Sequence, residues 1–245
     1  MRRIIAAFAV SLVAASVSHA SPFLSADLQI SNGPGSGTTL HADSSFLIAA
    51  SLGTPGADLA AAQALPNYGA LRVLAEVDTS GAPVVANTDA FFEDELRILT
   101  QPGGAMAILE TTWTVDVTGI STVGSNVIQR TAQLFINGQA FNIVGPGTFT
   151  QRMLVDASAL TIIQGQLVVS ISAPAGRTGH VRIDLMSTAT LTGLQLFEMD
   201  GITPIAATFS SASGMAYPVS VPEPALALLL AAGALGGRAA LRRRA

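Results

Sequence analysis

The chain between residues 21 and 221 is built from short apolar segments that end in glycine, proline, asparagine or serine. Within the segments, Val, Ile, Thr and Phe alternate with polar residues, as in half-buried strands. The pattern predicts an all-β fold, a single-domain antiparallel β-sandwich of jelly-roll-like type. The predicted strands are 26–30, 46–51, 70–77, 91–99, 106–117, 126–135, 140–144, 148–155, 160–172, 180–184, 190–197 and 205–209.

Two dipeptides mark tight hairpin turns in this pattern. Asn137-Gly138 and Asp200-Gly201 each stand between two apolar segments, and both dipeptides tolerate a positive φ. The one segment with a helix-like composition is 57–65, which is rich in alanine and lies between Pro55 and Pro66. We interpret it as a short helix or an irregular crossover.

The first twenty residues have a different character from the rest. Arg2 and Arg3 are followed by an apolar stretch over 4–15, and Ser18 and Ala20 are small residues spaced as in a cleavage site. This arrangement predicts a signal peptide over residues 1–20, removed during export through the Sec translocon. Residues 21–220 then form the ectodomain.

The last twenty-five residues again change character. Pro222-Glu223-Pro224 predicts an extended, exposed segment, because each proline fixes φ and removes a backbone donor. Residues 225–237 carry no polar side chain, but as a helix they would span only about 20 Å. Counting to Leu241, with Arg238 at the interface, brings the length near the lower limit for a membrane span. Arg242–Arg244 would stay cytoplasmic. An ordinary C-terminal anchor would account for these features too.

The order of these features resembles the PEP-CTERM sorting signal of Gram-negative bacteria, over residues 221–245. The resemblance implies recognition by a membrane-embedded exosortase, transient membrane anchoring of the precursor, and a final place at the cell surface or in the extracellular matrix. Four ectodomain phrases are similar to ones that recur in such proteins: 67–71, 91–96, 191–194 with 200–201, and 213–217. They imply a sandwich-type surface domain with no catalytic activity, associated with biofilm exopolysaccharide.

Without its two ends, the chain is acidic. Six arginines and no lysine face ten aspartates and five glutamates, a net charge of −9. This balance argues against nucleic acid and against anionic membrane surfaces as partners. The absence of cysteine excludes disulfides, thiol catalysis and thiolate metal sites.

The two histidines of the ectodomain belong to no catalytic or metal-binding motif. His41 and His180 lie far apart in the sequence, and the glycine-rich stretch 33–37 lacks the spacing of a nucleophile elbow. We expect neither histidine to form a catalytic or metal site. A surface hydrolase with a serine triad remains the least favoured hypothesis, because triad geometry is not visible in sequence.

An acidic cluster on one predicted strand offers a candidate polar site. Alternation over 91–99 places Asp94 on the apolar face with Phe92 and Leu96, so its carboxylate would point into the core. Such a group needs a partner. It would cap backbone amides at a bulge or sheet rim, pair with an arginine, or bind calcium together with Asp89 or Glu93. Calcium is the only cofactor that the sequence brings into question.

The aromatic residues give a second functional hypothesis. Trp113 shares a face with Val115 and Val117, which predicts a core position. Tyr68 and Tyr217 stand near glycines in predicted loops, where exposed rings would contact sugars. The alternative to a structural matrix component is therefore a carbohydrate-binding module that engages exopolysaccharide.

Overall fold

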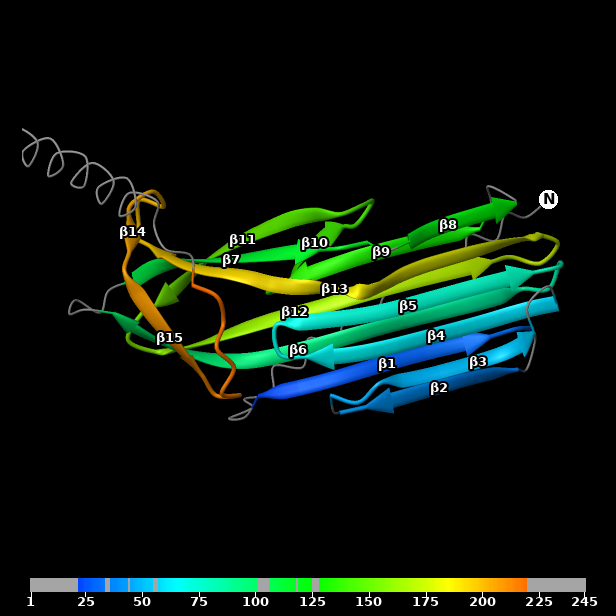
Figure 1. Ribbon diagram of the computed structural model, residues 1–245, viewed down its shortest axis with the longest axis horizontal. Coiled ribbons are helices and arrows are strands. Elements are labelled where there is room, and N and C mark those ends of the chain that lie inside the picture. Colours follow the sequence, from blue (N-terminus) through cyan, green and yellow to red (C-terminus); the bar gives the residue numbers. More distant parts are fainter. Residues whose placement is uncertain are drawn as a thin grey trace, which may run out of the picture.

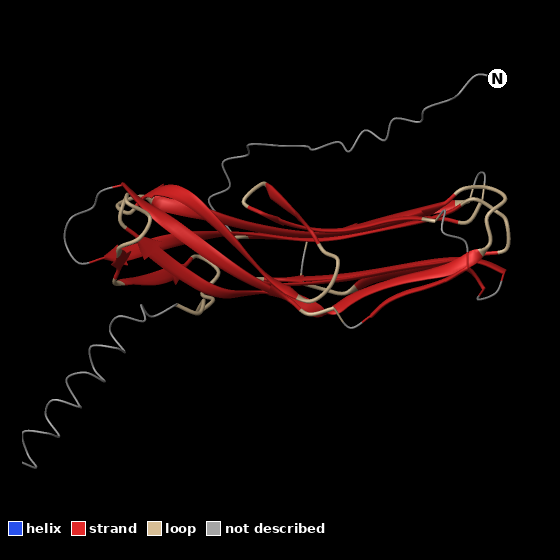
Figure 2. Cartoon of the chain, turned by 90° about the horizontal axis from the view of Figure 1, so that it is seen from above, coloured by secondary structure: helices blue, strands red, loops and turns tan. Residues whose placement is uncertain are grey.

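The computed structural model describes residues 22–33, 36–43, 45–54, 57–100, 106–117, 119–124 and 128–219. These residues form two antiparallel sheets that lie face to face along one long axis (Figures 1 and 2). No helix occurs in this part of the chain. The predicted all-β sandwich is confirmed.

The first sheet has seven strands in the order β10-β9-β12-β6-β1-β2, and β15 pairs with the end of β6. Its strands are β1 (Phe23–Ser31), β2 (Gly37–Ala42), β6 (Val84–Thr100), β9 (Gln129–Ile136), β10 (Gln139–Asn142), β12 (Leu160–Ala173) and β15 (Ala207–Ser211). The long pairing of β6 with β12 forms its centre.

The second sheet has eight strands in the order β11-β7-β13-β5-β4-β3, and β8 and β14 also pair with β13. Its strands are β3 (Ile48–Thr54), β4 (Ala57–Asn67), β5 (Ala70–Thr79), β7 (Met106–Val115), β8 (Gly119–Gly124), β11 (Gly147–Asp156), β13 (Gly179–Phe197) and β14 (Pro204–Ile205). The two strands predicted at 180–184 and 190–197 are one strand, β13. It pairs with β8 over residues 179–184 and with β7 over residues 189–197, and its register against β5 shifts between Leu185 and Ala189.

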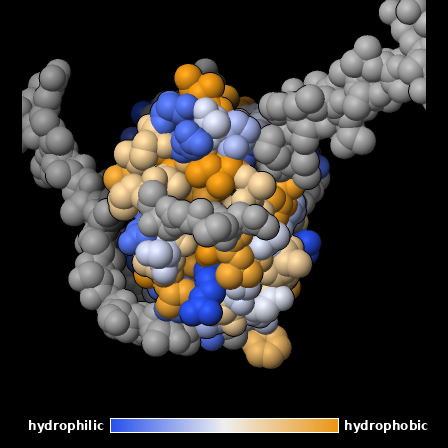
Figure 3. Space-filling model, turned by 90° about the vertical axis from the view of Figure 1, so that its left-hand side faces the viewer, coloured by the Kyte–Doolittle hydropathy of each residue, from blue (hydrophilic) through white to orange (hydrophobic). Residues whose placement is uncertain are grey.

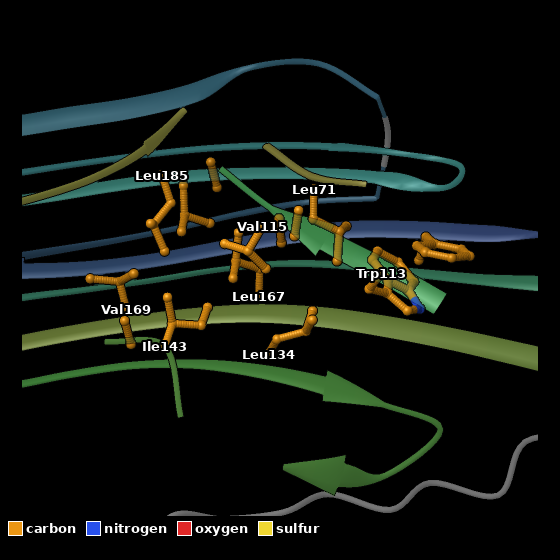
Figure 4. Packing of buried hydrophobic residues seen from close by; sticks show 14 of the residues in the cluster. Leu71, Trp113, Val115, Leu134, Ile143, Leu167, Val169 and Leu185 are labelled. Atoms are coloured by element: carbon orange, nitrogen blue, oxygen red, sulfur yellow. The ribbon is translucent and has the colours of Figure 1, made fainter. Parts of the chain in front are cut away.

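The core lies between the two sheets and follows the predicted alternation. Leu71 and Val115 of one sheet face Leu134 and Leu167 of the other, and all four are buried (Figure 4). Trp113 is 1% exposed, which confirms its predicted core position. Burial of these apolar side chains is the main source of stability in a chain without disulfides.

The alanine-rich segment 57–65 is neither a helix nor an irregular crossover. It belongs to β4, which pairs with β3 on one side and β5 on the other. Ala60, Ala62 and Ala64 alternate into the core and are completely buried. Pairing with two neighbours and burial of every second alanine override the helical preference of alanine, which is a weak local effect.

One of the two predicted tight turns has the expected form. Asn137 and Gly138 have φ values of 46° and 82° and join β9 to β10, where Gln139 pairs with Ile136. The other turn is wider than predicted. The last pair between β13 and β14 is Phe197 with Pro204, so six residues around Asp200-Gly201 form the connection.

Candidate functional site

The buried carboxylate of Asp94 is the centre of the candidate site. Asp94 lies in β6 between Phe92 and Leu96, and all three residues are completely buried. The prediction that Asp94 points toward the core is confirmed. Because a buried ionisable group is costly without partners, its contacts decide what the site does.

The donors that reach Asp94 come from residues 212–219, which we call the C-terminal strap. The backbone N–H of Ser213 donates to Oδ1 at 3.1 Å, and the Ser213 hydroxyl donates to Oδ2 at 2.5 Å. The Tyr217 hydroxyl donates to the same Oδ2 at 2.6 Å. These three donated hydrogen bonds satisfy both oxygens of the Asp94 carboxylate.

The backbone of the strap joins the two sheets. Ala212 N–H donates to the carbonyl oxygen of Glu95 in β6 at 2.9 Å, and Leu194 N–H in β13 donates to the carbonyl oxygen of Pro218 at 2.9 Å. Val219 then forms a parallel bridge with Leu194. Since β6 and β13 belong to different sheets, the strap links the two layers beside Asp94.

The ring of Tyr217 lies against Gly69, at the turn between β4 and β5. Gly69 has a φ of +69°, and a Cβ atom there would lie 2.9 Å from Cε1 of Tyr217. The neighbouring Tyr68 meets Phe92 edge-on, with ring centroids 6.5 Å apart, and Phe92 lies 5.5 Å from Trp113. The strap is thus continuous with the aromatic part of the core.

This environment keeps both tyrosine hydroxyls protonated. Burial, followed by the hydrogen bond to Asp94, raises the pKa of Tyr217 far above its usual range. Burial and the negative charge of Asp94 also raise the pKa of Tyr68. Tyr217 therefore remains a hydrogen-bond donor to Asp94 throughout the neutral pH range.

The two tyrosines do not provide the sugar-binding surface predicted from their loops. Tyr217 is 8% exposed, and its hydroxyl is used by Asp94. Tyr68 is half-buried and packs against Phe92. The expectation of an exposed Tyr217 is wrong because a nearby glycine can provide space for a packed ring as well as mark an open loop.

Asp89 and Glu93 lie on the opposite face of β6 from Asp94, so neither is brought together with it for the predicted calcium site. Gln166 donates to the Asp89 carboxylate at 3.1 Å, and Gln164 donates to Glu93 at 2.6 Å, both from β12. The same alternation that buries Asp94 turns the other two away from it. The described residues contain no group of three or more side chains arranged to hold a metal ion.

The outer face of the first sheet holds one carboxyl group with an unusual pKa. Burial raises the pKa of Asp89 to about 6, and the charge of its cross-strand partner Asp27 adds to the effect. Asp27 lies 2.6 Å from Nδ1 of His41, whose Nε2 lies 2.8 Å from Asp43. The hydrogen bond that His41 donates to Asp27 raises the pKa of His41. The charged form of Asp89 is therefore disfavoured in the folded protein.

We expect Asp89→Asn to stabilise the protein at neutral pH. The pKa of Asp89 rises from 3.8 to about 6 on folding, so the folded state prefers the protonated carboxyl. The resulting penalty is absent below pH 4 and is complete above pH 6. Asparagine removes the charge and keeps an acceptor for Gln166, so the free energy of unfolding should rise by up to about 3 kcal/mol at pH 7.5. Urea unfolding at pH 4 and pH 7.5, followed by Trp113 fluorescence, measures the gain.

The matched control for this prediction is Asp116→Asn, which changes an exposed aspartate on β7's C-terminal side. It should change the free energy of unfolding by only a few tenths of a kcal/mol, about 0.5 at most. An Asp89→Asn protein that is no more stable than wild type at pH 7.5 would contradict the assigned pKa.

His41 and His180 both lie on outer sheet faces beside carboxylates. His41 contacts Asp27 and Asp43, and His180 on β13 lies 2.9 Å from Glu76. Arg182, also on β13, contacts the same Glu76 carboxylate. The contacts with Asp27 and Glu76 join neighbouring strands, whereas activation of a nucleophile needs the imidazole to contact a hydroxyl or thiol.

The described residues end at Val219, just before the predicted sorting signal, which lies outside them. The residues concerned are Pro222, Glu223, Pro224, Arg238, Arg242, Arg243 and Arg244. The predicted signal peptide at 1–20 lies outside them as well. Val219 forms a parallel bridge with Leu194, so the chain there runs in the same direction as β13, which ends at Phe197. No helix among the described residues could span a membrane.

Sequence reasoning missed two residues that shape this site. Ser213 lies 119 residues from Asp94, and no local pattern indicates that they meet. Gly165 lies in the middle of β12 against the rings of Trp113 and Phe92. Its signal was available, because a glycine inside an otherwise alternating strand often marks a close approach.

No protein-family model matches this chain, and no curated protein or solved structure matches it either. Its function must therefore be inferred from its own residues. The relevant features are the anchored strap, the sequence that follows it and the outer surfaces of the sheets.

Proposed function

We propose that this chain is an exported surface or extracellular-matrix protein without catalytic activity, sorted through its C-terminal segment. The observation that carries the proposal is the order of features there. A strap held by Asp94 is followed by Pro222-Glu223-Pro224, the apolar residues 225–237 and an arginine-rich tail. A fixed strap presents the extended peptide behind it at a defined place, which suits recognition by a membrane-embedded enzyme.

In this proposal the two ends of the chain act in sequence. Residues 1–20 direct export through the Sec translocon, and an exosortase then processes the precursor at the Pro-Glu-Pro motif. Until then, residues 225–237 hold the precursor in the inner membrane, with the arginines on the cytoplasmic side. The processed domain reaches the surface or biofilm matrix of a Gram-negative bacterium.

We further propose that the sandwich is jelly-roll-like. The chain crosses between sheets from β2 to β3, from β5 to β6, from β6 to β7 and several times afterwards. Repeated crossing of this kind is what a jelly roll requires, since consecutive strands alternate between its two sheets.

A non-catalytic role is supported by how the described polar groups are used. The buried carboxylate of Asp94 holds the strap, and the histidines contact carboxylates on open sheet faces. The carbohydrate-binding alternative has lost the observation that favoured it, because Tyr217 is buried. A glycan array with the purified protein tests that alternative: specific polysaccharide binding would replace a purely structural role with a binding one.

Sorting can be tested in the native host with two full-length variants. Pro222→Ala with Pro224→Ala should block processing, so that the precursor length accumulates in the membrane fraction. Arg242→Gln, Arg243→Gln and Arg244→Gln together should weaken retention of the precursor, because they remove the positive charges that stop translocation. Cell fractionation with immunoblotting separates precursor from processed protein.

The matched control is Arg177→Gln, which removes an exposed arginine from the ectodomain. This variant should be processed and localised like the wild type. If the double proline variant is also processed normally, the sorting proposal is wrong and the tail is an ordinary anchor.

A further inference from the structure

Five large apolar side chains stand exposed at one end of the sandwich, and we call them the apolar tip. Their exposed fractions are 51% for Leu99, 45% for Met106, 59% for Leu160, 58% for Met199 and 79% for Ile202. All five lie where strands begin or end. Leu99 is next to last in β6, Met106 and Leu160 begin β7 and β12, and the other two lie in the turn after β13.

The pairing register brings these strand ends to the same end of the molecule. Leu160 at the start of β12 pairs with Arg97 near the end of β6, and Ile108 near the start of β7 pairs with Phe197 at the end of β13. Figure 1 shows this end on the left, beside β14 and β15. Figure 3 looks directly at it and shows hydrophobic residues interspersed with hydrophilic ones.

The turn that carries Ile202 has a defined shape. The Asp200 carboxylate accepts from the backbone N–H groups of Ile202 and Thr203, both at 2.8 Å, and from the Thr203 hydroxyl at 2.5 Å. Arg152 donates to the carbonyl oxygen of Gly201 at 2.9 Å. Ile202 is therefore presented to solvent on a well-supported turn.

The chain leaves the described structure toward this same end. Val219 forms a parallel bridge with Leu194, so the chain at Val219 runs in the direction of β13, toward its last residue, Phe197. Only the five residues 220–224 separate Val219 from the apolar run 225–237. Five extended residues span at most about 18 Å. A bilayer that holds the apolar run would therefore keep this end of the sandwich close to its surface.

We propose that the apolar tip is a lipid-contacting surface, which rests in the interfacial layer of the bilayer while the C-terminal segment is anchored. This inference rests on the proposed function, because it requires a membrane-held precursor. Moving exposed leucine, isoleucine and methionine side chains from water to the boundary between headgroups and acyl chains lowers the free energy. The short tether raises the local concentration of tip and membrane, so a weak contact is sufficient.

The charge of the ectodomain determines what kind of contact this is. With a net charge of −9, the domain is not attracted to an anionic surface. The contact must therefore depend on apolar burial, and it should persist at high salt, where surface charges are screened. Seating the tip would hold residues 220–224 at the membrane surface, where a membrane-embedded processing enzyme acts.

The absence of cysteine makes a fluorescence test direct. The full chain carrying Ile202→Cys, labelled with a nitrobenzoxadiazole dye, is reconstituted into vesicles of phosphatidylethanolamine and phosphatidylglycerol that contain doxyl-labelled phosphatidylcholine as quencher. The matched control is Val144→Cys, a 92% exposed position before β11, whose far end pairs with Met106. Quenching should be at least about threefold stronger at position 202 than at position 144, at low and high salt alike.

Two further comparisons separate the causes of failure. A chain that washes off the vesicles overturns the proposed function and this inference together. An anchored chain that is quenched equally at both positions overturns the inference alone. In the Ile202→Cys chain, adding Leu160→Glu and Met199→Glu should reduce quenching to the level of position 144, with the unfolding midpoint unchanged. Adding Leu47→Glu and Val123→Glu instead, at positions outside the tip, should leave the quenching at position 202 high.

Discussion

Gly165→Ala should destabilise the protein by about 3 kcal/mol or more, although it adds a single methyl group. A Cβ atom at this position would lie 2.5 Å from Cη2 of Trp113 and 2.7 Å from Cε1 of Phe92. Both rings are buried, at 1% and 0% exposure, so neither can turn away without disturbing its neighbours. Urea unfolding followed by the fluorescence of Trp113, the only tryptophan in the chain, measures the loss.

Gly145→Ala is the matched control for this substitution. A Cβ atom at Gly145 would meet nothing within 4 Å, and its backbone is not in the left-handed region. The control should unfold at the wild-type urea concentration. Equal midpoints for the two variants would mean that the sheets can separate around Trp113 at little cost, contrary to the close packing described.

Asp94→Ala is expected to cost about 3 kcal/mol. It removes the acceptor of three hydrogen bonds and leaves the Ser213 N–H and the Tyr217 hydroxyl without their partner inside the protein. The strap should also become sensitive to limited proteolysis, because its side-chain anchor is gone. The matched control is Glu95→Ala, which removes the next carboxylate along β6, on the opposite face of the strand.

A double-mutant cycle separates the anchor from general damage to the core. Tyr217→Phe alone should cost about 1 to 2 kcal/mol, since it removes one hydrogen bond to a charged group. Combined with Asp94→Ala, it should add almost nothing, because the Tyr217 hydroxyl has already lost its acceptor. Additive losses would show that the two side chains act independently.

The sequence predicted the local features of this fold well. Alternation over 91–99 identified the buried face of β6 and with it the place of Asp94, and Asn137-Gly138 marked a hairpin. Strand β2 was missed because Gly37, two threonines and His41 give little apolar alternation at an exposed edge. Strand β4 was misread because its alanines favour helix locally, whereas the decisive interactions are with β3 and β5.

The candidate site was predictable only in part, for a physical reason. Local periodicity shows which way Asp94 points, but its partners Ser213 and Tyr217 are 119 and 123 residues away. No period or turn signal spans such a distance. The same limit explains why the burial of Tyr217 was not predicted, since it depends on Gly69 in a different part of the chain.

The bond between Asp94 and the strap also sets the order in which the molecule can be completed. A growing chain has made β6 long before Ser213 and Tyr217 exist, and until then the Asp94 carboxylate lacks all three of its donors. Closing so large a loop late in folding is slow, since its entropy cost comes before its contacts are gained. The contacts of Asp94 with the strap therefore cannot form before the residues that immediately precede Pro222 have been made.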